Sequence, residues 1–336
     1  MIGSDLISNH KVRNCYGIMI NNKEKYKNLC DKEGTLPIFS KYWWLDAVCG
    51  ANNWDVALVE RNNEIVASMP YYLTNRFGMT LIKMPKLTQT MGPWIKYPEG
   101  QKYASKLSYE KEIFYELIEN LPTFTSFNQN FHYSITNWLP FYWKGFQQTT
   151  KYTYVIEDLS DLDKVYLNFK KQLRKEIRKI ECCINVSFED DIEKFFEINK
   201  LTYERQNKPI PYSLDFIKRI DSLCRELNCR KIFFAIDQNN NIHSALYLIW
   251  DANSAYDLMG GTDPKHKSSN AKSLITWEAI KYAAQVTKSF DFEGSMMQNV
   301  EQFNRGFGAV QKQYFNISKV SSKLMRVKKA LSQIAK

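Results

Sequence analysis

Two carboxylate side chains occupy alternate positions in a short aromatic segment near the end of the sequence. Residues 290–293 read Phe-Asp-Phe-Glu, so Asp291 and Glu293 alternate with phenylalanines. This period of two predicts a half-buried strand with both acids on one face. A partly buried carboxylate whose pKa rises toward neutrality can accept a proton from a reacting group. The pair is therefore a candidate acid–base site, and the alternative is that both acids are solvated charges at a sheet edge.

The composition is that of a folded protein with sizeable cores. The 336 residues are 44% hydrophobic and 14% aromatic, and this length favours two domains. The apolar runs are too short for a membrane-spanning helix, and the first residues do not read as a signal peptide. The seven cysteines are scattered, with two of them adjacent, which is typical of reduced thiols. We therefore expect a cytoplasmic protein.

The sequence lacks the motifs of several common enzyme classes. There is no Walker loop, no GxSxG elbow and no HExxH motif. The four histidines are dispersed and no CxxC pair occurs, so we expect no metal. The net charge of +10 is compatible with a partner such as nucleic acid, anionic lipid or a phosphate-bearing cofactor, and equally with a mildly basic enzyme whose charge has no specific role.

Two hairpin-like segments recur at half the chain length. Residues 56–73 and 233–250 each read as a strand, an Asn-rich turn and a second strand. At an offset of 177, Asn62-Asn63 align with Asn239-Asn240. A tandem pair of similar domains would produce such a repeat, although so short a motif also recurs by chance. We predict one domain over residues 1–153, a second over 154–320 and a basic helical tail over 321–336.

The second half reads as an ordered series of helices and strands. Helical spacing of apolar residues predicts helices over 162–181, 190–206, 213–227, 271–286 and 300–306. Strands are expected over 230–237, 242–250, 254–260, 290–293 and 311–318. The predicted fold class is α/β (α+β), with a mixed, largely antiparallel sheet flanked by helices in each half.

This order of elements resembles the GNAT acyltransferase fold. The segments LRKEIRKIE (173–181), TYERQNKPIPYS (202–213), FDFEGS (290–295) and QFNRGFG (302–308) resemble the GNAT-related family that includes the Fem peptidoglycan-bridge transferases. The GGTDP loop with the helix after it fits this pattern, and MPKLTQTMGPWI (84–95) resembles the family's first domain. The resemblance covers residues 36–318 and implies tandem GNAT-like domains, the first on the acceptor side and the second carrying acyltransferase activity.

The resemblance places the phosphates of the donor at the start of helix 271–286. A helix N-terminus suits an anion because its first N–H groups are unpaired and its dipole end is positive. The candidate donor-binding residues are Gly261, Thr262, Lys265, Lys267, Ser268, Ser269, Asn270 and Lys272. The alternative is an ordinary polar loop with Asn270 as a helix cap. The family's glutamine or arginine with closely spaced glycines is not evident, so acyl-CoA is the expected donor with other donors still open.

In this fold the strand at 290–293 separates from the strand at 254–260, which opens the site. The resemblance therefore makes Glu293 the candidate general base, with Asp291 and Asp257 as further catalytic carboxylates. Asp257 has a structural alternative, as the partner of a nearby lysine or backbone amide. Gly260 is a substrate-binding candidate at the same opening.

The QFNRGFG motif departs from the Fem pattern at one position. Aligned with RFKKGFG, Phe303 matches the aromatic residue and Arg305 the second basic residue, and both are substrate-binding candidates. Asn304 stands where Fem aminoacyl transferases carry a lysine that helps to stabilise the oxyanion. It is a catalytic candidate as a neutral hydrogen-bond donor. The missing charge disfavours aminoacyl-tRNA as donor. Phe303 and Phe307 are alternatively a core pair.

The leading hypothesis is an acyltransferase that moves an acyl group from acyl-CoA to a small-molecule, lipid-linked or peptide amine. One alternative is a Fem-type aminoacyl transferase that uses aminoacyl-tRNA on a peptidoglycan precursor. The other is a non-catalytic tandem protein that binds RNA or a membrane surface. The basic helix and the basic tail would support tRNA binding or peripheral membrane contact, but both patterns are also typical of solvated or packed helix faces.

Overall fold

The computed structural model describes residues 21–294 and 296–321. The first half contains α1 (Asn22–Lys32), η1 (Ile38–Ser40), α2 (Tyr42–Cys49), β1 (Trp54–Arg61), β2 (Glu64–Arg76), β3 (Met79–Lys83), β4 (Trp94–Ile95), α3 (Tyr103–Glu119), β5 (Ser126–Asn130), α4 (Leu139–Trp143) and β6 (Gln147–Ile156). The second half contains α5 (Leu162–Asn168), α6 (Lys171–Ile180), β7 (Ile184–Phe188), α7 (Ile192–Glu204), α8 (Leu214–Glu226), β8 (Arg230–Asp237), β9 (Ile242–Trp250), β10 (Ser254–Thr262), η2 (Pro264–Ser269), α9 (Ala271–Val286), β11 (Ser289–Asp291), α10 (Gln298–Gly306) and β12 (Val310–Val320).

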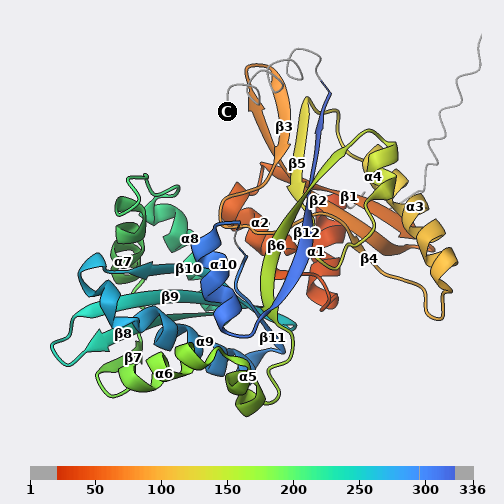
Figure 1. Ribbon diagram of the computed structural model, residues 1–336. Coiled ribbons are helices and arrows are strands. Elements are labelled where there is room, and N and C mark those ends of the chain that lie inside the picture. Colours follow the sequence, from red (N-terminus) through yellow and green to blue (C-terminus); the bar gives the residue numbers. More distant parts are fainter. Residues whose placement is uncertain (1–20, 295, 322–336) are drawn as a thin grey trace, which may run out of the picture.

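The described strands form one 12-stranded sheet that runs through both halves (Figure 1). Its order is β1-β2-β3-β5-β12-β6-β11-β10-β9-β8-β7, with β4 beside β2. Most neighbours pair antiparallel, whereas β3–β5 and β10–β11 pair in parallel. The predicted α/β fold class with a mixed, largely antiparallel sheet is confirmed, but the two sheets that we expected are joined into one.

Most elements of the two halves follow the same order. The series α1-α2-β1-β2-β3-α3-β5-α4-β6 matches α7-α8-β8-β9-β10-α9-β11-α10-β12, and each series places its parallel strand pair at the same step. The short strand β4 of the first half and α5, α6 and β7 of the second half have no counterpart in this repeat. The two Asn-turn hairpins, β1–β2 and β8–β9, therefore occupy equivalent topological positions.

The last strand of each half is exchanged between the halves. β6 pairs with β11 of the second half, and β12 pairs with β5 of the first half. The exchanged strands also pair with each other from Val310↔Val155 to Ser318↔Gln147, and they cross the centre of the molecule side by side (Figure 1). The boundary predicted at 153/154 therefore falls inside β6, and the domain limits stay a prediction. Residues 322–336 of the predicted tail lie outside the described residues.

The two halves also share a hydrophobic core. Side chains of α2 such as Trp44 are buried in one cluster with Phe195 and Ile217 of α7 and α8. The Phe39 ring of η1 packs edge-on against the Tyr256 ring of β10, with centroids 4.9 Å apart. Because burial of each large apolar side chain contributes about 1.5–3 kcal/mol, this shared cluster holds the site and the first half in one body.

The helix predicted over 162–181 is wrong as a single element. It breaks into α5 and α6 at Phe169, whose backbone is extended. The Phe169 ring is buried between Trp277 and Phe307, with ring centroids 5.1 Å and 5.0 Å away. The Lys170 N–H then donates to the Gly306 carbonyl at 2.9 Å. Helical spacing alone could not reveal this break, because contacts from distant residues cause it.

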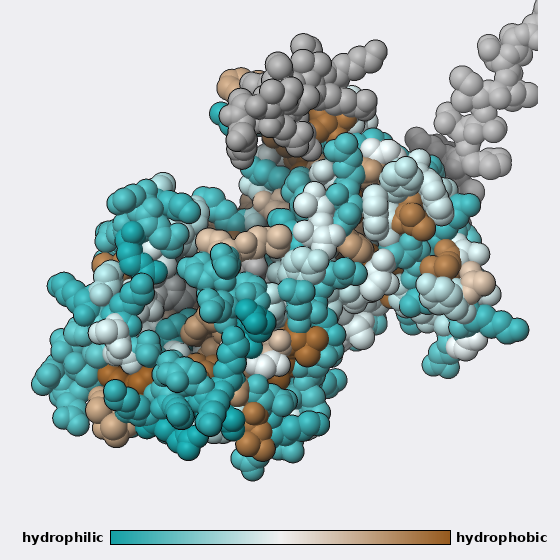
Figure 2. Space-filling model, in the orientation of Figure 1, coloured by the Kyte–Doolittle hydropathy of each residue, from teal (hydrophilic) through white to brown (hydrophobic). Residues whose placement is uncertain are grey.

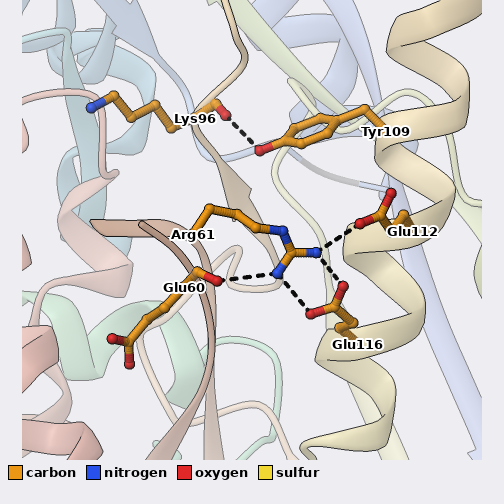
Figure 3. A network of polar contacts seen from close by, with 6 residues as sticks. All are labelled: Glu60, Arg61, Lys96, Tyr109, Glu112 and Glu116. Carbon is orange, nitrogen blue, oxygen red and sulfur yellow. Dashed lines mark hydrogen bonds and ion pairs between the residues drawn. The ribbon is translucent and has the colours of Figure 1, made fainter. Parts of the chain in front are cut away.

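Helix α3 is attached to the first hairpin by ionic contacts (Figure 3). Arg61, at the end of β1, donates to Glu112 at 2.8 Å and to Glu116 at 3.0 Å. The Tyr109 hydroxyl of α3 donates to the Lys96 carbonyl at 3.2 Å. No helix in the described part of the chain is long and apolar enough to cross a bilayer.

Candidate active site

A cavity of about 940 Å³ opens where β10 and β11 separate. The two strands pair only from Ser254↔Ser289 to Tyr256↔Asp291, whereas β10 continues to Thr262. Beyond Tyr256, no described strand pairs with this side of β10. The cavity is lined by β10 with parts of α6, α7, α9 and α10. The face of the molecule shown in Figure 2 is mostly hydrophilic.

Glu293 lines this cavity on a tightly turned backbone. It adopts φ 58°, so the strand ends at Asp291 and the predicted alternation over 290–293 does not continue to Glu293. The Glu293 N–H donates to Asp291 Oδ1 at 2.8 Å, which stabilises this turn. Gly294 follows with φ 59°, and a Cβ there would lie 2.3 Å from the Tyr152 carbonyl oxygen, so only glycine fits.

Glu293 lines the cavity, whereas Asp291 is buried away from it. Asp291 is 1% exposed and does not line the cavity; its Oδ1 also accepts a hydrogen bond from the Thr153 hydroxyl. Burial raises the pKa of Asp291 to about 7, against the opposing effect of that hydroxyl and of the Glu293 N–H. Burial, followed by the charges of Asp291 and Asp257, raises the pKa of Glu293 well above its usual range. Glu293 Oε1 has no hydrogen-bond partner among the described residues.

Asp257 and Lys272 form an ion pair inside the cavity. Lys272 Nζ, in the first turn of α9, lies 3.0 Å from Asp257 Oδ2 on β10. Both residues line the cavity. A Cβ at Gly260 would lie 2.8 Å from Lys272 Nζ, so this glycine makes room for the lysine. The sequence left open that Asp257 is the partner of a nearby lysine, and the structure shows this pairing.

Asn199 and two glycines fix the shape of β10 beside the cavity. A Cβ at Gly261 would lie 2.4 Å from the Ile198 carbonyl oxygen, so α7 can approach the strand only at a glycine. Asn199 Nδ2 donates to the Gly260 carbonyl at 2.8 Å, and its Oδ1 accepts from the Tyr212 hydroxyl at 2.7 Å. The sequence analysis did not identify Asn199 or Tyr212 as site residues. Tyr212 lies within the 202–213 segment and Asn199 lies three residues before it.

The residues predicted to bind the donor are only partly brought together. Gly261, Thr262, Lys267, Asn270 and Lys272 line the cavity, as does the substrate-binding candidate Gly260. Ser268 and Ser269 instead line a neighbouring cavity of about 500 Å³ that also reaches Asn270, and Lys265 lines neither of these two cavities. Asn270 is the N-cap of the 16-residue helix α9, in the left-handed conformation, without a side-chain capping bond. The first turn of α9 thus begins at the cavity.

Helix α10 brings two of its three candidates to the site. Phe303 lines the cavity and packs on Phe307 with 5.1 Å between ring centroids, so the packing alternative is present in the fold and substrate binding by Phe303 stays a prediction. Asn304 lines the cavity and is 3% exposed, and its Nδ2 has no partner among the described residues. Arg305 does not line the cavity, and its Nε donates to Glu301 at 2.7 Å.

The charge of the cavity is positive. Five lysine or arginine side chains line it against three carboxyl groups. Lys170, Arg205, Lys208 and Lys267 have no carboxylate within 4.0 Å among the described residues, whereas Lys272 is paired. Arg205 and Lys208 were missed as site residues, although they belong to the 202–213 motif. Within the described residues, no cluster of three or more histidine, cysteine or acidic side chains is suited to a metal ion.

Comparison with known proteins gives this geometry a family context. Residues 168–298 match the family model described as acetyltransferase (GNAT) domain. This segment, less than half of the chain, is similar to that domain. The predicted resemblance to GNAT proteins is confirmed over this segment, which supplies most of the residues that line the cavity.

Solved structures share the fold of most of the chain, and FemX is among them, as the predicted resemblance to Fem-like proteins implies. The crystal structure of FemX superposes with a TM-score of 0.63 at 11% identity, over 88% of this chain and 96% of that chain. The C-terminal domain of a putative lysylphosphatidylglycerol synthetase from Agrobacterium fabrum gives 0.51 at 11% identity, over 89% and 92% of the two chains. L-PGS from Bacillus licheniformis gives 0.51 at 9% identity, over 90% and 94%. A search of curated protein sequences finds no match.

Proposed function

We propose that the protein transfers an acyl group from acyl-CoA to an amine acceptor in the cavity beside β10. The observation that carries the proposal is the meeting of three features in one cavity: the unpaired edge of β10, the N-terminus of α9 and the carboxyl group of Glu293. An extended donor can hydrogen-bond to a free strand edge, and its phosphates suit a helix N-terminus. The GNAT domain supplies independent support for acyl transfer.

Glu293 accepts the proton of the attacking amine in this mechanism. The amine nitrogen attacks the thioester carbonyl carbon, the thiolate of the donor leaves, and the released proton moves to the Glu293 carboxylate. Because the pKa of Glu293 is raised, its ionised form is a stronger proton acceptor than an ordinary carboxylate. The fraction in that form increases with pH, so the rate rises as pH increases through this pKa.

Asn304 is the second catalytic group that we propose. Its unpartnered Nδ2 is a neutral hydrogen-bond donor at the cavity wall, suited to the carbonyl oxygen as that oxygen becomes negative. The lysines without carboxylate partners, Lys170 and Lys267, would attract the phosphates of the donor.

A binding competition followed by a rate measurement tests the proposal. Acetyl-CoA and CoA should displace each other from the protein, and uncharged or charged tRNA should not compete. Glu293→Gln should bind the donor normally but lose about 10²–10⁴ in turnover with an amine acceptor, because the amide keeps the size of the side chain without its proton acceptance. Competition by aminoacyl-tRNA alone would support the Fem-type aminoacyl transferase instead. Normal turnover by the folded variant would reject Glu293 as base.

A further inference from the structure

Backbone strain is concentrated at the cavity. Among the described residues, nine that are not glycine have positive φ, and six of these are asparagines, which tolerate the left-handed region. The other three are Phe77, Leu87 and Glu293. Phe77 lies at the exposed turn between β2 and β3, directly before Gly78. Leu87 and Glu293 both line the cavity, although they come from opposite halves of the chain.

Leu87 is held in this conformation by the first half. Trp44 Nε1 donates to Thr88 Oγ1 at 3.0 Å, and the Thr88 hydroxyl lies 3.2 Å from the Lys86 carbonyl oxygen, which accepts its hydrogen bond. Asn130 Nδ2 donates to the Gln89 carbonyl at 2.8 Å. A leucine is disfavoured at φ 51° because its Cβ approaches the following carbonyl oxygen. A residue keeps a strained backbone conformation only where the surrounding contacts fix it, and strained residues cluster at functional sites.

Apolar side chains of one hydrophobic cluster line the cavity together with Leu87. Tyr212, Leu258 and Met259 line the same cavity, and all three belong to the hydrophobic cluster on which Leu87 packs. The Tyr212 hydroxyl is already bonded to Asn199, so the ring of Tyr212 is what remains for a ligand. Arg205 and Lys208, from the segment between α7 and α8, line the same cavity, so it combines apolar and cationic side chains.

We propose that Leu87 forms, with Tyr212 and Met259, a subsite for an apolar group of one of the two reactants. The first half thereby supplies a specificity residue to the active site of the second half. The inference rests on the proposed acyl transfer at this cavity. The apolar group is either the acyl chain of the donor or the side chain of the amine acceptor, and the two sources share the same chemistry: each carbon that enters the subsite leaves water.

Two ligand series separate these sources. Straight-chain acyl-CoAs from acetyl to octanoyl form one series, and straight-chain alkylamines from ethyl to octyl form the other, with affinities measured by isothermal titration calorimetry. In the wild-type protein, affinity should rise several-fold with each added carbon in one series and then reach a limit. Leu87→Ala should move that limit to chains one or two carbons longer, because it removes the three outer carbons of the side chain.

Leu87→Asn provides the variant that is compatible with the backbone. Asparagine tolerates the left-handed conformation and keeps a similar size, so the variant should fold but lose most of the dependence on chain length. Met84→Ala changes a partly buried residue of the same segment that does not line the cavity, and its profile should match the wild type.

The outcomes distinguish the subsite from the proposed function. A changed limit in the acyl-CoA series assigns the subsite to the donor, and a changed limit in the alkylamine series assigns it to the acceptor. The inference is overturned if Leu87→Ala and Leu87→Asn keep the wild-type profile in both series. CoA carries no acyl group, so failure of CoA to bind the wild-type protein counts against the proposed donor alone, and the alkylamine series still tests Leu87.

Discussion

Replacing Asp291 with asparagine should make the protein more stable at alkaline pH. Asp291 is 1% exposed, and no lysine or arginine lies within 4.0 Å of it among the described residues. Both of its hydrogen bonds, from the Thr153 hydroxyl and the Glu293 N–H, reach Oδ1. The amide oxygen of asparagine can accept the same two bonds. The substitution therefore removes the titration of a buried acid while it keeps the local structure.

The size of the effect follows from the pKa of Asp291. Burial raises this pKa from its usual value near 4 to about 7, so the native state holds the proton more tightly than the unfolded state. Stability from this group is fully present below pH 4 and is lost as pH rises to about 7. A difference of about three pKa units corresponds to about 4 kcal/mol, since each unit contributes about 1.4 kcal/mol.

Urea denaturation from pH 4 to pH 8 measures this difference. Wild type and Asp291→Asn should have similar unfolding free energies at pH 4, and the variant should be more stable by up to about 4 kcal/mol at pH 8. Asp163→Asn, at an exposed position in α5, is the control that should follow the wild type. Parallel pH curves for wild type and Asp291→Asn would refute the reasoning, because Asp291 would then titrate alike in both states.

Three further predictions concern the site and the fold. Gly261→Ala should destabilise the protein by about 1–3 kcal/mol in urea denaturation, because the new Cβ would lie 2.4 Å from the Ile198 carbonyl oxygen; unchanged stability would show that α7 can move away at no cost. Lys267→Ala should weaken CoA binding more at low salt than at high salt, whereas Lys265→Ala should have little effect, since Lys265 does not line the cavity. Equal losses in both variants would argue against this placement of the phosphates. Arg61→Ala should lower the unfolding free energy by about 1 kcal/mol or less, because its contacts with Glu112 and Glu116 are partly solvated, and a much larger loss would mean that α3 depends on them.

Local patterns were enough to predict most elements of the second half. The helix at 271–286 and the strands at 230–237 and 242–250 agree with α9, β8 and β9 at both ends. Apolar periodicity and turn residues act within a few residues of each other, so a single sequence carries this information. The Asn-turn repeat likewise indicated the equivalent hairpins of the two halves, because both strands of a hairpin are local.

The sequence could not predict how the final strands pair. β6 and β12 have ordinary strand patterns, but each completes the sheet of the other half, and that choice depends on contacts between residues more than a hundred positions apart. The break at Phe169 has the same kind of cause, since the rings of Trp277 and Phe307 hold it away from a continuous helix.

For the site, the sequence by itself determined which residue types were available, and the tertiary structure decided which of them meet. Glu293, Asp257 and Asn304 were recognisable from their motifs, and all three line the cavity. Only the fold revealed that Asp257 is paired with Lys272 and that Asp291 lies buried behind Glu293. Leu87 belongs to the other half and carries no chemistry that a motif would mark. Its place in the cavity is set by the packing of the first half against the second, a long-range property that no local pattern of residues encodes.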